Sequence, residues 1–130
     1  MELKPLGSTG LLISPLGLGT VKFGRNTGVK YPSPFDIPEE GELEALLWLA
    51  RGLGINLLDT APAYGASEER LGRLLQGRRE EWVIVGKAGE EFEGGVSRYD
   101  FTPAAIEASL HRSLKRLKTE YLAADSFRWE

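Results

Sequence analysis

Hydrophobic residues along the 130-residue chain follow two spacings that alternate from one segment to the next. From Glu39 to Leu53, leucines and an alanine recur every three or four residues, the spacing of an amphipathic helix. A shorter run of the same kind predicts a second helix from about Ser67 to Gln76. A third helix is predicted to begin at Thr102-Pro103, because threonine is a good N-cap and proline suits the first helical position.

The same rules predict how these helices start and which faces they bury. Pro38 suits the first position of the first helix, and Ser67 is the expected N-cap of the second. The third helix is expected to bury one leucine-rich stripe and to turn a basic face outward. The stripe comprises Ile106, Leu110, Leu114 and Leu117, and the basic face comprises Arg112, Lys115, Arg116 and Lys118.

Short apolar runs bounded by glycines separate the helices and predict strands. Core strands are expected at residues 16–20, 55–59 and 82–87, and a fourth is expected to start at Tyr121-Leu122. A Gly-rich turn at residues 7–10 predicts a β-hairpin within residues 1–14. Residues 21–37 and 88–101 are expected to be loops with solvated charges, including Lys22, Arg25, Lys30, Glu90, Glu91 and Glu93.

Alternating strands and helices predict an α/β fold with a parallel sheet, either open and doubly wound or closed into a β/α barrel. Thr20, Asp59 and Lys87 fall at the C-terminal ends of the predicted strands, where barrel enzymes place their active sites. This placement favours the barrel. A complete barrel takes about 250 residues. We therefore expect residues 1–130 to form a single partial domain: the hairpin, three β/α units and the start of a fourth strand.

The amino-acid composition argues against two classes of function, nucleic-acid binding and membrane binding. The net charge of −3 and pI of about 5.3 argue against nucleic-acid binding, and no basic face or long apolar run suggests a membrane partner. The chain has no cysteine, and its first residues lack the apolar core of a signal peptide. A cytoplasmic protein is the expectation.

Three residues at neighbouring strand ends form a candidate proton-donating site. Asp59 ends one strand, Lys87 ends the next, and Tyr64 lies between them in a tight loop with Pro62 and Gly65. An ammonium about 4 Å from a phenolate stabilises it by at most about 4 kcal/mol at an effective dielectric constant near 20. The residues and their spacing fit a structural ion pair beside a packed tyrosine equally well.

The stretch Asp59-Thr-Ala-x-x-Tyr64-Gly-x-Ser-Glu68, preceded by Gly17-Leu-Gly-Thr20 and followed by Gly86-Lys87, closely resembles the aldo-keto reductase family. The resemblance extends from about Leu6 to Leu122. It implies the N-terminal half of a (β/α)8 barrel that uses NADPH to reduce a small aldehyde or ketone. It also implies that Tyr64 donates the proton while Lys87 and Asp59 tune it, and that Gly19, Thr20 and Asp59 contact the cofactor.

The end of the chain departs from the family pattern. The family's fourth strand is an aliphatic run ending on a catalytic histidine, whereas residues 123–130 contain neither. A truncated or frameshifted gene is one hypothesis for this tail. The family's phosphate- and adenine-binding residues belong to the second half of the barrel. We therefore expect weak cofactor binding and no meaningful turnover from these 130 residues alone. The alternative function is a non-catalytic half-barrel that acts as an interaction module.

A half-barrel is expected to expose strand edges and an apolar interior, and both features recruit partners. The interior is predicted to be lined by Leu16, Leu18, Leu57, Val83 and Val85. Self-association or aggregation through these edges is therefore expected, with aggregation favoured because the tail lacks β-branched residues.

Overall fold

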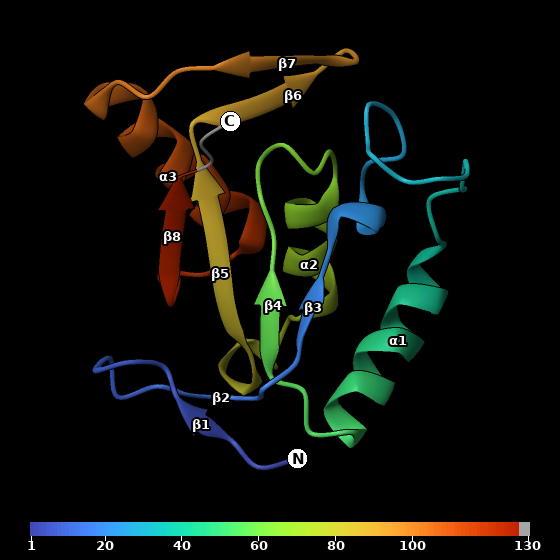
Figure 1. Ribbon diagram of the computed structural model, residues 1–130, viewed down its shortest axis with the longest axis vertical. Helices are drawn as coiled ribbons and strands as arrows, with labels where there is room; N and C mark the ends of the chain where they lie inside the picture. Colours follow the sequence, from blue (N-terminus) through green and yellow to red (C-terminus); the bar gives the residue numbers. More distant parts are fainter. Residues whose placement is uncertain (128–130) are drawn as a thin grey trace.

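A computed structural model of the protein describes the backbone of residues 1–127 and the side chains of residues 1–123. Its centre is a four-stranded parallel sheet in the order β3-β4-β5-β8, flanked by three helices and two antiparallel hairpins (Figure 1). None of the helices in these residues is long and apolar enough to cross a membrane. The elements are β1 (Lys4–Pro5), β2 (Leu12–Ile13), β3 (Gly17–Gly19), the 3₁₀ turn η1 (Val21–Phe23), α1 (Glu40–Gly52), β4 (Leu57–Asp59), α2 (Ser67–Leu74), the 3₁₀ turn η2 (Arg79–Glu81), β5 (Val83–Ala88), β6 (Glu90–Glu93), β7 (Val96–Tyr99), α3 (Pro103–Leu117) and β8 (Ala124–Phe127).

The register of the sheet divides its side chains between two faces. Leu18, Leu58 and Ile84 are in register across β3, β4 and β5, and the latter two are fully buried beneath the helices. They belong to a core that also contains Phe23, Leu43, Leu47, Ala50, Leu71, Leu75, Trp82 and Leu117. Leu18 packs against this core, so its predicted place in the barrel interior is wrong.

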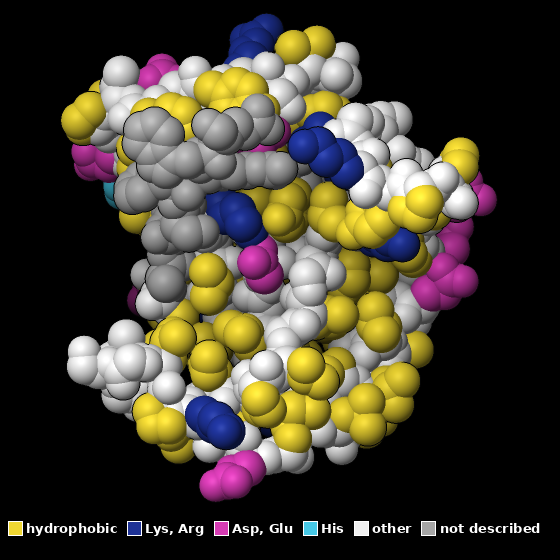
Figure 2. Space-filling view, in the orientation of Figure 1, with side chains coloured by type: hydrophobic (Ala, Val, Ile, Leu, Met, Phe, Trp, Pro, Cys, Tyr) yellow, Lys and Arg dark blue, Asp and Glu magenta, His cyan; other side chains and the backbone are white. Residues whose placement is uncertain are grey.

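The opposite face of the sheet is open. Leu57, Val83 and Val85 alternate with the buried residues of β4 and β5 and are only half-buried. In the orientation in which this face is visible, hydrophobic side chains gather over the sheet (Figure 2). Leu16, also predicted to line the interior, precedes β3 and is 61% exposed.

The two hairpins lie at opposite ends of the sheet (Figure 1). The predicted β1–β2 hairpin is present at the N-terminal end, where the Asn56 side chain fixes it to the start of β4. Asn56 Oδ1 accepts a hydrogen bond from Ser14 N at 2.7 Å, and Asn56 Nδ2 donates to Leu12 O at 2.9 Å. The β6–β7 hairpin lies beyond the C-terminal ends of the strands.

Residues 88–101 were expected to be a loop, and that prediction is wrong. They contain the end of β5 and the hairpin β6–β7, in which Glu90 pairs with Tyr99 and Glu93 with Val96. The connection is Gly94-Gly95 with positive φ at both residues, the backbone that a two-residue hairpin loop of right-handed twist requires. The sequence signal for this hairpin was the Gly94-Gly95 pair between two short segments in which apolar and polar residues alternate.

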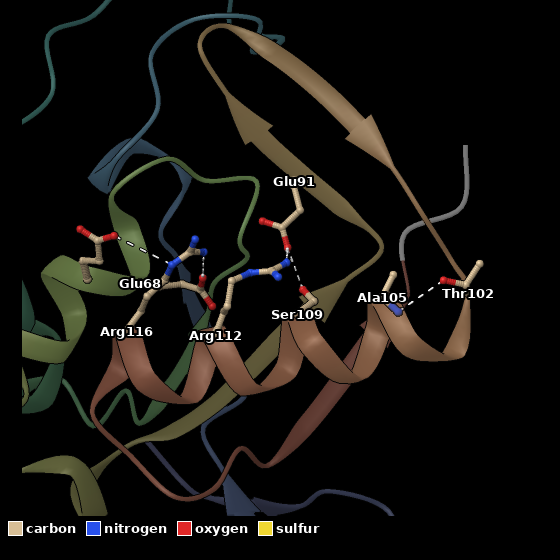
Figure 3. Close-up of polar contacts among 8 residues, drawn as sticks. Glu68, Glu91, Thr102, Ala105, Ser109, Arg112 and Arg116 are labelled. Atoms are coloured by element: carbon tan, nitrogen blue, oxygen red, sulfur yellow. Dashed lines mark hydrogen bonds and ion pairs between the residues drawn. The ribbon is translucent and has the colours of Figure 1, made fainter.

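Two helix starts also differ from their predictions. Helix α1 begins at Glu40, one residue later than predicted, with Glu39 as its N-cap, so Pro38 precedes the cap and is not the first helical residue. The Glu39 backbone N–H donates to Glu42 Oε2 at 3.0 Å, one half of a capping box. Helix α2 begins at Ser67 with Ala66 at the cap position, so Ser67 does not cap it. Thr102 does cap α3, because its Oγ1 accepts a hydrogen bond from Ala105 N at 3.3 Å (Figure 3).

Helix α3 is rotated relative to its predicted orientation. Ser109, Ser113 and Leu117 are its buried residues, whereas Ile106, Leu110 and Leu114 are only half-buried. Gly72 of α2 lets the two helices approach closely, because a Cβ there would lie 2.1 Å from Arg116 O. Arg116, expected on the outer side, turns toward α2 instead and pairs with the buried Glu68 at 3.2 Å (Figure 3).

The fourth strand forms later than expected and despite its unusual sequence. Strand β8 begins at Ala124, not at Tyr121-Leu122, and it pairs in parallel with β5 from Val85 to Ala88. The backbone thus accepts residues that the composition of the tail argued against. Residues 128–130, the end of that tail, lie outside the described residues.

We expect Gly24→Ala to lower the free energy of unfolding by about 1–3 kcal/mol, the usual cost of overpacking. A Cβ at Gly24 would lie 2.3 Å from both Ser67 N and Tyr64 O, which are backbone atoms that cannot rotate away. Gly41→Ala in α1 is the matched control, since a Cβ there meets nothing within 4 Å. It is expected to stabilise the chain by up to about 1 kcal/mol. Urea unfolding of both variants tests this; equal effects would contradict the packing.

Glu68 is expected to make stability depend on pH. Burial raises the pKa of its carboxyl, opposed by Ser113 and Arg116. Glu68 Oε2 and Ser113 Oγ are both buried, and neither has a hydrogen bond of ordinary geometry within the described part of the chain. Between the ordinary and the raised pKa, the folded chain holds a proton that the unfolded chain has lost. The free energy of unfolding should therefore fall as pH rises through that window.

Glu68→Gln should flatten this fall, because a neutral amide has no proton to lose and can hydrogen-bond Ser113. The control is Glu69→Gln, the next residue, whose side chain is 57% exposed and lies 3.9 Å from the same Arg116. Urea unfolding at a series of pH values from about 4 to 8 measures the slopes. A slope that Glu68→Gln leaves unchanged would show that another group is responsible.

Candidate functional site

The three predicted catalytic residues meet at the C-terminal end of the sheet. Asp59 is the last residue of β4 and is in register with Val85, and Lys87 lies two residues further along β5 on the same face. The Lys87 ammonium forms an ion pair with Asp59 Oδ1 and lies 3.3 Å from Thr60 O. The Lys87 side chain is 18% exposed and that of Asp59 is 48% exposed, so the pair lies at the wall of an open space.

Tyr64 lies against this ion pair. Its ring centroid is 4.8 Å from Lys87 Nζ, within the range of a cation–π contact. The Tyr64 backbone N–H donates to Ala61 O at 3.1 Å, and Tyr64 O accepts from Ser67 N at 3.2 Å, so the tyrosine lies in a hydrogen-bonded turn. A phenol, an ammonium and a carboxylate in contact can move a proton to a bound acceptor while the ammonium balances the phenolate charge.

A chain of buried hydroxyl groups fixes the loops that present these residues. Ser67 Oγ donates to Thr20 Oγ1 at 2.8 Å, and Thr20 Oγ1 donates to Asp59 O at 2.9 Å. Thr60 Oγ1 lies 3.1 Å from Ser67 Oγ. Since the Ser67 hydrogen is used on Thr20, Thr60 is the donor in that bond. The chain ties the ends of β3 and β4 to the first residue of α2.

Thr20 is fully buried in this chain, and its hydroxyl is occupied on both sides. Its predicted contact with a cofactor stays a prediction, and its evident role here is to hold the two strand ends together. Gly19 and Asp59, the other two predicted cofactor contacts, are neighbours in register and accessible. A Cβ at Gly19 would meet nothing within 4 Å, so open space lies beside Gly19, next to Asp59 across the strands.

Arg25 is a site residue that the sequence prediction missed. It was expected to be a solvated loop charge, but it is 8% exposed and joins three segments. Its guanidinium donates to Ala63 O at 3.0 Å, lies 3.7 Å from Glu90 of β6, and stacks 3.8 Å from the Phe92 ring centroid. Glu90 was likewise expected to be solvated and is 6% exposed. No local pattern signals this pair, because its members are far apart in sequence.

Comparison with known proteins identifies the family. The Aldo/keto reductase family profile matches residues 15–127. The chain is 35% identical to an L-galactose dehydrogenase from Arabidopsis thaliana over 94% of its own length and 36% of that protein. A solved structure, described as a putative aldo-keto reductase from Pseudomonas aeruginosa, has 55% sequence identity to this chain and a TM-score of 0.88. The match covers 98% of this chain and 47% of that protein. An aldo-keto reductase from Bacillus halodurans, solved in its holo form, has 30% sequence identity to this chain and a TM-score of 0.79. That match covers 98% of this chain and 40% of the Bacillus halodurans protein.

The chain therefore spans less than half the length of these relatives. Their fold is the (β/α)8 barrel, so the predicted fold class is confirmed: the parallel sheet with three helices is the N-terminal part of such a barrel. With the profile covering most of its residues, the chain belongs to the Aldo/keto reductase family.

Proposed function

We propose that this chain provides the proton-donating part of an NADPH-dependent carbonyl reductase site. The observation that supports it is the contact of Lys87 with both Asp59 Oδ1 and the Tyr64 ring. A nicotinamide cofactor, when bound, supplies the hydride that no side chain can store. Gly19 and Asp59 would hold its nicotinamide end, because they are in register and open space lies beside Gly19.

In this proposal each residue has a separate task in the reduction of a small aldehyde or ketone. Tyr64 Oη donates a proton to the carbonyl oxygen and becomes a phenolate. The adjacent Lys87 ammonium stabilises that phenolate through space, and Asp59 keeps Lys87 charged and oriented. The hydroxyl chain through Ser67 and Thr20 holds the loop so that these groups need no rearrangement when a proton moves.

A hybrid protein tests this function. Residues 1–122 of this chain would replace the matching segment of the Pseudomonas aeruginosa protein, which is 55% identical and supplies the remainder of a barrel. We expect the hybrid to oxidise NADPH with small aldehydes at a rate near that of the intact protein. Tyr64→Phe should lower kcat by at least about 100-fold, the usual contribution of a general acid.

Two controls make this assay specific. Tyr121→Phe removes a hydroxyl from an exposed tyrosine that follows α3 and packs against Arg79, and it should leave kcat unchanged. The 130-residue chain alone should show no turnover above its own Tyr64→Phe background, because it encloses the site on one side only. A hybrid that retains full activity without the Tyr64 hydroxyl would refute the proposed role of Tyr64.

We also propose a second function, self-association of the chain through its open sheet. Among the described residues β3 and β8 are the end strands, each with one side unpaired. Exposed leucines of α1 and of the residue that caps its end add apolar area, with Leu46 38%, Leu49 58% and Leu53 57% exposed. A two-fold axis parallel to the strands would place β8 of one copy beside β3 of the other, in parallel orientation, and close an eight-stranded ring.

Analytical ultracentrifugation tests the second proposal. We expect a species of twice the chain mass of 14.3 kDa at micromolar concentrations. Val83→Lys should shift it to the monomer, because Val83 lies on the open face of the sheet. Val96→Lys is the control, since Val96 is 58% exposed on the β6–β7 hairpin, away from that face. A monomer across a broad concentration range would argue against self-association.

A further inference from the structure

A cleft of about 460 Å³ opens beside Tyr64, and neither Asp59 nor Lys87 is among the residues that line it. Its walls come from three segments: the loop after η1, the turn that contains Tyr64, and the β6–β7 hairpin. Polar residues line it, among them Arg25, Lys30, Tyr64, Glu90, Ser97 and Tyr99. A substrate whose carbonyl oxygen is bound at Tyr64 would extend its remaining atoms into this cleft.

The hairpin wall is built to accept hydrogen bonds. Ser97 Oγ donates to Glu90 Oε1 at 2.9 Å, and Tyr99 Oη donates to the same oxygen at 3.4 Å. Both hydroxyl hydrogens are thereby used, so each oxygen keeps lone pairs that can accept from a ligand. Groups that accept hydrogen bonds favour a ligand that donates them, such as an alcohol.

This wall is held at a fixed position relative to Tyr64. Arg25 lies 3.7 Å from Glu90 and donates to Ala63 O, the carbonyl next to Tyr64, at 3.0 Å. Both charged groups are more than nine-tenths buried, which leaves them little freedom to follow a ligand. The distance between the proton donor and the hydroxyl groups of the hairpin is therefore set before a ligand binds.

We propose that this cleft selects carbonyl compounds that carry hydroxyl groups on the carbons next to the carbonyl. An apolar ketone of the same shape would strip water from Ser97, Tyr99 and Lys30 and return no hydrogen bond. A hydroxylated ketone replaces those water contacts. Sites that hydrogen-bond a substrate hydroxyl discriminate strongly against analogues that lack it. The inference rests on the proposed function, because it takes Tyr64 as the group that binds the carbonyl oxygen.

The test compares the dissociation constants of two ligands for the full 130-residue chain without cofactor. ¹⁵N–¹H NMR titrations measure both constants. Dihydroxyacetone and pentan-3-one are the two probes, since they have the same shape and differ only in replacing each hydroxyl with a methyl group. We expect dihydroxyacetone to bind about 30-fold more tightly, and at least about tenfold, because it makes two hydrogen bonds of about 1 kcal/mol each that pentan-3-one cannot make. Shifted amide signals should map to residues 96–99 and to the turn around Tyr64.

Two variants assign the preference to the hairpin wall. Ser97→Ala and Tyr99→Phe should each reduce the ratio of the two dissociation constants by about fivefold, the effect of one lost hydrogen bond. Tyr121→Phe is the matched control, because its side chain is 52% exposed, close to the 49% of Tyr99, and lies outside the cleft. Dispersed amide signals confirm that each variant is folded, and either of the two hairpin variants suffices for the assignment.

A ratio below tenfold, no binding of dihydroxyacetone, shifts confined to other residues, or a ratio that both hairpin variants leave unchanged would each overturn the inference. These outcomes are separate from the proposed function, which depends on hydride transfer that requires Tyr64. A hybrid enzyme that reduces pentan-3-one as fast as dihydroxyacetone would support the function and overturn the selectivity. If the chain binds dihydroxyacetone preferentially but the hybrid enzyme is inactive, the selectivity is supported and the proposed function is overturned.

Discussion

The buried chain of hydroxyl groups from Thr60 through Ser67 and Thr20 to the Asp59 carbonyl is the contact on which the rest of the site depends. It satisfies polar atoms that are wholly removed from water, and such atoms are costly to leave unpaired. Each bond joins segments far apart in sequence. The ends of two strands and the start of a helix therefore have one arrangement in which all three hydroxyls are bonded.

That arrangement explains why the reactive groups can be only partly buried without being disordered. The ion pair and the tyrosine lie at the surface of an open space, but their backbones are anchored from behind by the hydroxyl chain and by Gly24, which packs directly on the turn. Rigidity comes from the layer beneath the site and accessibility from the layer above it. This division of roles is typical of sites placed at the C-terminal ends of parallel strands.

The sequence predicted most of the elements because hydrophobic spacing depends on local geometry. All three helices, the first hairpin and the three core strands are present within a few residues of their predicted positions. Predictions that depended on neighbours were less accurate. The orientation of α3 buries Ser109, which hydrogen-bonds Glu91 of β6, and Ser113, not the face with the most leucines. Ser67 looked like an N-cap, but burial gave its hydroxyl a different partner.

The β6–β7 hairpin and the buried position of Arg25 were both missed by sequence-based prediction, and the two errors have the same physical cause. Arg25 and Glu90 each resemble a surface charge when viewed alone, and only tertiary contact makes them a buried pair. A consequence follows for protein engineering. The loop that contains Arg25, the turn before Tyr64 and the β6–β7 hairpin all contact the Arg25 guanidinium, so a change in one of these segments affects the other two. Grafting a hairpin from a relative would leave a buried charge uncompensated unless the matching loop were moved with it.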